Sequence, residues 1–292
     1  MNIKAGICGL DEIEWFADAG AKELYLGVSN LPSHVKNPKA NIKRIEGRDL
    51  EDSMEFLHSK GVRLFAAAND FNSVDIKQVI EEMLFLSEHG IDGFIVSSPE
   101  ILTAYPKNAR QPEWHLSVVA ACTNRRTLDW YHSLGIVRFT LFQQLLPSEA
   151  EPLFNCPGVE SEVFLNYGEF SEECSDIDDD LLPTGETCAN FDGICRGCSG
   201  EINFKEGKFC NAVLPLPDGK EFRCFKPDTE TTARHIWQYV RKADWLKLVR
   251  KNTLENRKKI LLFGKEIIKE ALACPSEDEF PAIARKVYER FK

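Results

Sequence analysis

The hydrophobic and polar positions of this chain repeat one unit, in which a helical stretch ends near a glycine and a short apolar run follows at once. FADAG is followed by AKELYLGV, FLHSKG by VRLFAAAND, LSEHG by IDGFIVSS, and YHSLG by IVRFTLFQ. Glycine readily adopts the backbone conformation that ends a helix, and such apolar runs are typical of strands buried on both faces. The repeat therefore predicts helices that alternate with parallel strands.

Four further segments fit the same alternation and bring the number of predicted strands to eight. They are NIKAGICG at the start, PEWHLSVVA and SEVFLNYG in the middle, and ADWLKLVR near the C-terminus. In a chain of 292 residues, eight alternating strands favour a closed (β/α)8 barrel over an open doubly wound sheet. After the first strand, GICGLDEI does not fit the GxGxxG pattern of a dinucleotide-binding fold. We therefore expect an α/β protein with a TIM-like barrel.

The C-terminal ends of the strands form the functional face of such a barrel. The pattern places mainly polar residues there. They are Cys8, Ser29, Asn30, Asn69, Asp70, Ser97, Ser98, Ser117, Gln143, Gln144, Asn166, Tyr167 and Arg250.

A cysteine-rich insertion interrupts the barrel pattern after the seventh strand. We expect residues 1–168 to supply strands one to seven, residues 169–235 to form the insertion, and residues 236–292 to supply the last strand and C-terminal helices, all in one structural domain. The tail from TLENRKK onward has the pattern of two amphipathic helices joined at Pro275. It predicts a helical extension of the barrel.

Six of the ten cysteines lie in that insertion, which is poor in long apolar runs. They are Cys174, Cys188, Cys195, Cys198, Cys210 and Cys224, with glycines at 193, 197, 200 and 207 beside them. Crowded cysteines are usually ligands, and glycine lets a backbone fold tightly around an ion or a cluster. A disulfide framework, a structural zinc site and an iron-sulfur cluster all fit this composition.

The expected compartment favours a metal over disulfides. The N-terminus shows neither the pattern of a signal peptide nor an apolar stretch long enough to span a bilayer, so we expect a cytoplasmic protein without a membrane partner. Cytosolic thiols are kept reduced. A zinc ribbon would show two close CxxC pairs or histidines, but Cys195 and Cys198 form one tight pair and no histidine lies between His132 and His235. Well-spread cysteines favour a 4Fe-4S cluster, with zinc as the alternative.

The net charge of -10 argues against a broad, nonspecific nucleic-acid surface, although a local basic patch is compatible with it. ARHIWQYVRKADW is the one segment that combines aromatic and basic residues in the way a single-strand groove does. Its simpler interpretation is the helix before the last strand.

Several segments together resemble the collagenase-like peptidase family U32. AGAKELYLGVSN is similar to the second strand of that family, GVRLFAAAND to its third, and EWHLSVVAACTNRRTLDWYHSLGIVRFTL to the block from its fifth to its sixth strand. ADWLKLVRK stands where the family has its last strand and an arginine. The likeness runs along nearly the whole chain.

The resemblance also implies the ligands of a cluster. In the insertion, CANFDGIC is similar to the paired cysteines of the family, with an aromatic residue and a glycine between them. The implied 4Fe-4S ligands are Cys188, Cys195, Cys210 and Cys224. About twenty residues separate the seventh strand from the first of these, a departure from the family, so Cys174 and Cys198 remain alternative ligands.

The family resemblance implies two kinds of activity. The family is named for proteolysis, yet members are associated with oxygen-independent hydroxylation of a quinone precursor or of RNA bases, and some act in pairs. A peptidase needs an activated nucleophile or a metal-bound water, and neither GxSxG nor HExxH occurs here. We expect redox modification of a small molecule or an RNA base, with a peptidase or a binding protein with a structural metal as alternatives, and a partner from the same family as a further expectation.

Four residues are the candidates for substrate chemistry. His115, in the predicted strand EWHLS, is either a core histidine bonded to its neighbours or a general acid or base, and its family position favours the pocket. Asn69 and Asn124 either grip a carboxylate, amide or base edge or cap loops. Arg250 would bind an anionic oxygen donor or a phosphate. The hypothesis of a substrate held beside a cluster fails if Asn69 and Arg250 both point into the helix layer.

Overall fold

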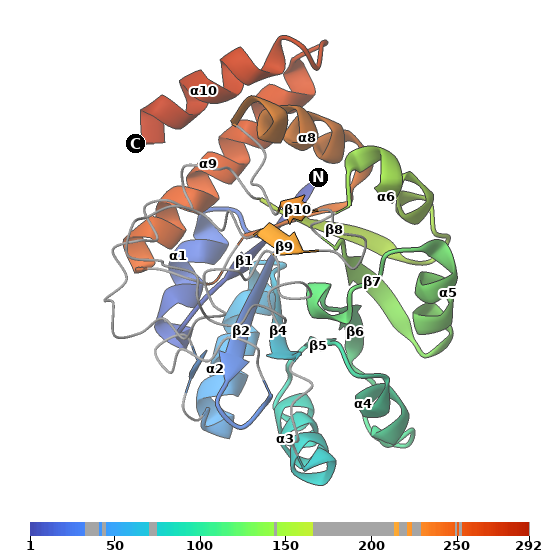
Figure 1. Ribbon diagram of the computed structural model, residues 1–292. Coiled ribbons are helices and arrows are strands. Elements are labelled where there is room, and N and C mark those ends of the chain that lie inside the picture. Colours follow the sequence, from blue (N-terminus) through green and yellow to red (C-terminus); the bar gives the residue numbers. More distant parts are fainter. Residues whose placement is uncertain are drawn as a thin grey trace.

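Eight parallel strands close into a barrel surrounded by helices (Figure 1). The computed structural model describes residues 1–32, 41–42, 45–69, 75–142, 145–165, 213–215, 221–223, 229–248, 250 and 253–291. The barrel strands are β1 (Asn2–Gly6), β2 (Glu23–Val28), β4 (Arg63–Ala68), β5 (Gly93–Val96), β6 (Glu113–Leu116), β7 (Ile136–Thr140), β8 (Glu160–Phe164) and β11 (Trp245–Lys247). The order β1-β11-β8-β7-β6-β5-β4-β2, closed by pairing of β1 with β2, confirms the predicted α/β barrel.

Helices connect the strands on the outside of the barrel (Figure 1). They are α1 (Ile13–Asp18), α2 (Gly47–Ser59), α3 (Ile76–Glu88), α4 (Pro99–Ala104), α5 (Arg125–Ser133), α6 (Pro147–Phe154), α8 (Thr229–Lys242), α9 (Leu254–Ala273) and α10 (Phe280–Phe291). The tail forms the two predicted helices, α9 and α10, which pack on each other and on α8. None of the described helices is long and apolar enough to cross a membrane.

The glycines of the repeated unit have the backbone conformation that the pattern predicts. Gly20, Gly61, Gly90 and Gly135 each follow a helix with φ of +97°, +68°, +102° and +104°. Residues with a side chain rarely adopt such angles, so a glycine at this point lets the chain leave the helix and turn into the next strand.

In the part of the chain that the structure describes, two short pieces of sheet lie beyond the eight predicted strands. β3 (Asn41–Ile42) pairs with the C-terminal end of β2. β9 (Val213–Pro215) and β10 (Glu221–Arg223) form an antiparallel pair of their own. Strands of two or three residues show no alternation of apolar and polar positions long enough to recognise in a sequence.

Among the described residues, two separate hydrophobic clusters hold the fold together. The large one lies between the strands and the helices and includes Ile3, Leu24 and Phe139. The small one consists of Tyr25, Phe65 and Ile95, which face the inside of the barrel. The interior of a TIM barrel is usually filled by branched aliphatic residues. Here charged side chains fill much of it, and they are described below.

The predicted cluster ligands Cys188, Cys195, Cys210 and Cys224, and the alternatives Cys174 and Cys198, lie outside the described residues. β8 ends at Phe164 at the C-terminal end of the barrel, and β8 pairs directly with β11. The chain thus leaves the barrel at its functional end before it enters the cysteine-rich segment. The three predicted segment boundaries stay predictions.

Candidate functional site

The inward-facing side chains of the barrel form successive levels of four. In a barrel of this type each strand is shifted by about one residue relative to its neighbour, so alternate strands contribute the side chains of one level. The first two levels from the N-terminal end are Asn2, Arg63, Glu113 and Glu160, then Glu23, Gly93, Arg138 and Trp245. The third and fourth are Lys4, Phe65, His115 and Glu162, then Tyr25, Ile95, Thr140 and Lys247. The fifth, at the C-terminal mouth, is Gly6, Ala67, Ser117 and Phe164.

Charged side chains on these levels form one connected set, which we call the ion ladder. Its members are the cations Lys4, Arg63, Arg138 and Lys247, the carboxylates Glu23, Glu113, Glu160 and Glu162, and His115. Arg63, Glu113 and Glu160 of the first level reach solvent, whereas Lys4, Glu23, Arg138 and Glu162 are fully buried. Buried charges are tolerated only when they are paired and hydrogen-bonded, and this ladder balances four cations with four carboxylates.

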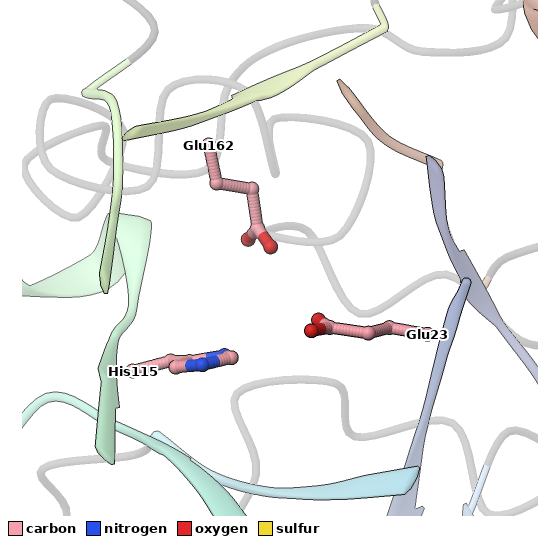
Figure 2. Close-up of side chains that lie close together, drawn as sticks. All are labelled: Glu23, His115 and Glu162. Atoms are coloured by element: carbon pink, nitrogen blue, oxygen red, sulfur yellow. The ribbon is translucent and has the colours of Figure 1, made fainter. Parts of the chain in front are cut away.

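The side chains of Glu23, His115 and Glu162 converge from three strands on one point of the barrel axis (Figure 2). One donor atom from each lies within 4.8 Å of the others, an arrangement that is compatible with a metal ion. The ammonium group of Lys4 lies at this point, however, 3.1 Å from Glu23 Oε2, 3.2 Å from Glu162 Oε2 and 2.6 Å from His115 Nδ1. Lys4 supplies the positive charge that holds the three groups together, so we do not assign them as metal ligands.

His115 is buried and both of its ring nitrogens are engaged. Nδ1 accepts a hydrogen bond from Lys4, Nε2 donates one to Glu113 at 2.7 Å, and the ring stacks on Phe65. Burial and the surrounding cations, Lys4 first among them, hold the pKa of His115 well below its ordinary value. The ring is therefore neutral, and it lies two levels below the mouth.

Glu162 and Lys247 continue the ladder toward the mouth. Lys247 Nζ lies 2.9 Å from Glu162 Oε1 and 3.4 Å from Thr140 Oγ1. Burial alone would raise the pKa of Glu162, but Lys247, Lys4 and Arg138 outweigh it and hold that pKa far below its usual range. Burial lowers the pKa of Lys247 to about 8, with Glu162 opposing the shift and Lys4 adding to it.

Arg250 lies at the rim of the mouth, against the neighbouring strands β1 and β2, in a slot that two glycines leave open. A Cβ atom at Gly27 would lie 1.9 Å from Arg250 Nη1, and one at Gly6 would lie 2.6 Å from Arg250 Cβ. Only glycine at these two strand positions lets the arginine lie so close to the backbone. Burial lowers the pKa of Arg250, while Tyr25 and Cys8 oppose the shift. The guanidinium is thus held at the rim, against the strands and away from the helix layer.

Asn69 also points into the mouth. It is buried, and its amide nitrogen donates to Ser117 Oγ at 3.0 Å, across the strand ends of β4 and β6. Asn69 and Arg250 therefore both avoid the helix layer, so the arrangement that would have refuted the substrate hypothesis is not found.

Asn124 has a different position from the other three candidates. Its side chain is exposed, and its amide oxygen accepts the backbone N–H of Thr127 at 3.0 Å, which caps the N-terminus of α5. This is the capping role that the sequence left open, and the structure does not bring Asn124 together with Asn69, His115 and Arg250.

Of the other residues predicted for the mouth, some lie in the part of the chain that the structure describes and some lie outside it. Cys8 follows β1, is half-buried and donates to the carbonyl of Arg250. Ser29, Asn30, Ser97, Ser98 and Ser117 also lie at or beyond strand ends. Outside the described residues lie Asp70, Gln143, Gln144, Asn166 and Tyr167.

A cavity of about 770 Å³ opens at the opposite, N-terminal end of the barrel. Arg63, Glu113 and Glu160 of the ion ladder line it together with Asp244 and Phe154. In this end of the ladder, Arg63 pairs with Glu113, and Glu160 pairs with Arg138 of the second level. Since TIM barrels carry their chemistry at the C-terminal face, we assign the cavity to the structural end.

A comparison with protein families decides which family this barrel represents. The model of peptidase family U32 matches residues 9–170, more than half of the chain. The chain belongs to peptidase family U32. Most strands of this U32 chain that surround the mouth end within the matched segment. Arg250 lies beyond that segment.

Curated relatives of this U32 chain carry one kind of name. The tRNA hydroxylation protein P of Escherichia coli is 26% identical over 196 residues, which cover 65% of this chain and 41% of that protein. The tRNA hydroxylation protein P2 of Bacillus subtilis is 26% identical over 98 residues, which cover 33% of this chain and 32% of that protein. The matched regions thus span less than half the length of either relative.

Among solved structures, the U32 peptidase Mk0906 is similar with a TM-score of 0.50 at 12% identity, over 87% of this chain and 94% of that chain. At this identity the likeness concerns the fold alone.

Proposed function

We propose that this U32 barrel takes part in the hydroxylation of an RNA base by an oxygen-independent reaction, with a 4Fe-4S cluster beside its C-terminal mouth. The observation that carries the proposal is the mouth itself, where Arg250 and Asn69 point inward at the end of the barrel from which the cysteine-rich segment leaves. Relatives named for tRNA hydroxylation support RNA as the substrate class.

The proposed cluster ligands are Cys188, Cys195, Cys210 and Cys224, with Cys174 and Cys198 as alternatives. Thiolates are the donors that iron-sulfur clusters use, and a bound cluster would supply one-electron transfer. The described cysteines are less suited to this role. Cys122, Cys156 and Cys274 are buried, and burial raises the pKa of Cys8, Cys122 and Cys156, which favours their protonated thiols.

The residues of the mouth would bind and orient the substrate. Arg250 presents a buried cation that suits an anionic oxygen donor or a phosphate, since a guanidinium binds such groups in a bidentate manner. Asn69 carries an amide that suits the edge of a base, with Ser117 fixing its orientation. Phe164 occupies the fifth level at the end of β8 and offers an aromatic ring there as an apolar wall.

The geometry gives less support to proteolysis. Among the described residues, the barrel histidine is His115, and its nitrogens are bonded to Lys4 and Glu113. A serine or cysteine protease needs a histidine that is free to take a proton from its nucleophile.

Mass spectrometry of nucleosides from total tRNA tests the proposal. Cells that lack the gene should lose a nucleoside that is heavier than its parent by one oxygen atom, and the wild-type chain should restore it in anaerobic culture. Cys188→Ser and Arg250→Met should fail to restore it. Lys60→Met is the matched control, because Lys60 lies on the surface in an exposed pair with Asp18. An unchanged set of oxygenated nucleosides in the deletion strain would contradict the proposal.

A further inference from the structure

We infer that the outer side of α9 is a docking surface for the sugar-phosphate backbone of a tRNA. Three exposed lysines form this surface, Lys259, Lys265 and Lys269, and we call them the lysine face. The inference rests on the proposed function, because it takes an RNA base at the mouth as one part of a long polyanion. The nucleotides on either side of that base have to lie on the outside of the barrel.

The lysine face begins beside the mouth. α9 follows the last barrel strand and runs along the outside of the barrel beside α1 (Figure 1). Arg257 in the first turn of α9 pairs with Glu12, and Glu12 also accepts the backbone N–H of Cys8, two residues after the end of β1. From Lys259 to Lys269 the helix extends about 15 Å along the outer wall. The face therefore lies where a backbone that leaves the mouth can reach it.

The lysine face lies opposite the side of α9 that packs on the barrel. On that side a Cβ atom at Gly264 would lie 3.3 Å from Leu248 Cδ2. At about 100° per residue, the three lysines fall within roughly a third of the helix circumference, and all three are exposed. They therefore present their charges in one outward direction.

The glutamates on the outer side of α9 do not neutralise the lysine face, because other cations engage them. Lys258 Nζ lies 3.0 Å from Glu255 Oε1, and Arg290 Nη2 of α10 lies 2.8 Å from Glu266 Oε1. Lys and Arg outnumber Glu by five to three in α9 and by three to one in α10, whereas Asp and Glu outnumber Lys and Arg by 46 to 36 in the whole chain. The two helices are thus a locally basic region of an acidic protein.

The three lysines keep their positive charge toward solvent. Lys265 Nζ donates to the backbone carbonyl of Ala19 at 2.6 Å, which fixes its position without a counter-charge. In the part of the chain that the structure describes, Lys259 and Lys269 form no ion pair. Phosphate groups that contact these ammonium groups would release their counterions, and this release supplies most of the affinity of nonspecific nucleic-acid binding.

The composition of the lysine face favours RNA over a protein partner. Lysine is depleted in protein-protein interfaces, whose buried centre is apolar. Here Leu262 is exposed by 43% between the lysines, and Leu272, the other exposed leucine of α9, is about 15 Å further along the helix. Exposed leucines that are this far apart do not form a contiguous apolar patch.

Fluorescence anisotropy of labelled tRNA measures the docking directly. The probe is total tRNA from the deletion strain, which is titrated with the anaerobically purified full chain at several concentrations of KCl. Each lysine that neutralises a phosphate contributes about 0.7–0.9 to the fall of log K with log [KCl]. Replacing Lys259, Lys265 and Lys269 together by glutamine should therefore reduce this slope by about two to three and weaken binding at least about tenfold.

Two matched sets of variants control for the loss of charge. Lys60→Gln, Lys77→Gln and Lys107→Gln together remove the same number of exposed positive charges away from α9, and this set should keep the slope of the wild type. Arginine at the three positions of the lysine face keeps the charges and should keep the affinity. An equal loss in the control set, or wild-type affinity and slope in the glutamine set, would overturn the inference.

The same variants distinguish RNA from a protein partner and the inference from the proposed function. If the glutamine set binds tRNA like the wild type but no longer restores the oxygenated nucleoside, the face contacts something other than tRNA and the inference is wrong. A deletion strain with unchanged nucleosides, together with tRNA binding that depends on the three lysines, would remove the proposed reaction and leave the docking surface.

Discussion

Replacing Glu162 by glutamine tests whether the ion ladder is held by its charges. Glu162 is fully buried and pairs with Lys4 at 3.2 Å and with Lys247 at 2.9 Å. Glutamine has nearly the same shape, so Glu162→Gln creates no cavity. The substitution removes one negative charge from the buried part of the described ladder. Three buried cations, Lys4, Arg138 and Lys247, then face one fully buried carboxylate, that of Glu23.

The expected loss of stability follows from this imbalance. Removing one partner of a buried ion pair costs about 3–5 kcal/mol, because an uncompensated charge remains in a medium of low polarity. Glu151→Gln is the matched control, since the pair of Glu151 with Lys242 is partly exposed. Exposed pairs contribute about 0–1 kcal/mol. The free energy of unfolding from urea denaturation at neutral pH should therefore fall far more in Glu162→Gln than in the control.

The pH dependence of this difference provides a second test. The pKa of Glu162 is held below its unfolded value of about 4.3, so its contribution is fully present above that pH and is lost as the pH falls. The gap between wild type and Glu162→Gln should consequently narrow in acid. A loss of less than about 1 kcal/mol at neutral pH, or a gap that does not change with pH, would refute the electrostatic account of the ladder.

Three further predictions concern other parts of the molecule. Gly27→Ala should displace Arg250 from its slot and abolish restoration of the oxygenated nucleoside, while circular dichroism stays that of a folded chain; full restoration would contradict the role of the slot. His115 has a pKa below that of the unfolded state, so stability should fall by up to about 1.4 kcal/mol per pH unit as the pH drops below about 6.5. Urea titrations should show this slope reduced in His115→Gln, and an equal slope would count against a buried neutral ring. Thr253→Ala should lower the free energy of unfolding by about 1 kcal/mol, because Thr253 caps α9 through the backbone N–H of Asn256; no change would show that the cap is dispensable.

The eight barrel strands and their order were predictable from the sequence because each strand buries both faces. A buried strand needs an apolar run, and the glycine that ends the preceding helix marks where that run begins. Gly20 and Gly90 illustrate this, since both have the positive φ that the pattern required. The short strand β3 was not predictable, because two residues that pair through backbone atoms leave no pattern in their side chains.

The mouth of the barrel was predictable in part. Asn69 and Arg250 follow apolar strands and do point inward, because residues at strand ends face the opening of a closed barrel. His115 was expected near the substrate and lies deeper, among Lys4 and Glu113. Its depth depends on the stagger between strands, which no single strand reveals.

The ion ladder was missed, although its signal was present in the sequence. Lys4 stands in NIKAG, Arg138 in IVRFT and Lys247 in WLKLV, so each is a charge inside an otherwise apolar strand. Such a residue has to find a counter-charge inside the barrel, because water does not reach it. Which residues become partners depends on the closure of the barrel, which brings strands distant in the sequence onto one level.

Anaerobic purification followed by iron, sulfide and zinc analysis tests the central claim most directly. The account predicts about four irons and four sulfides per chain, with a broad visible absorbance that air destroys. Cys188→Ser should lose that iron, whereas Cys274→Ser should retain it, because the Cys274 thiol is buried at the joint of α9 and α10 and donates to the Ser276 carbonyl. About one zinc per chain without sulfide would contradict the iron-sulfur barrel and identify the cysteine-rich segment as a structural zinc site.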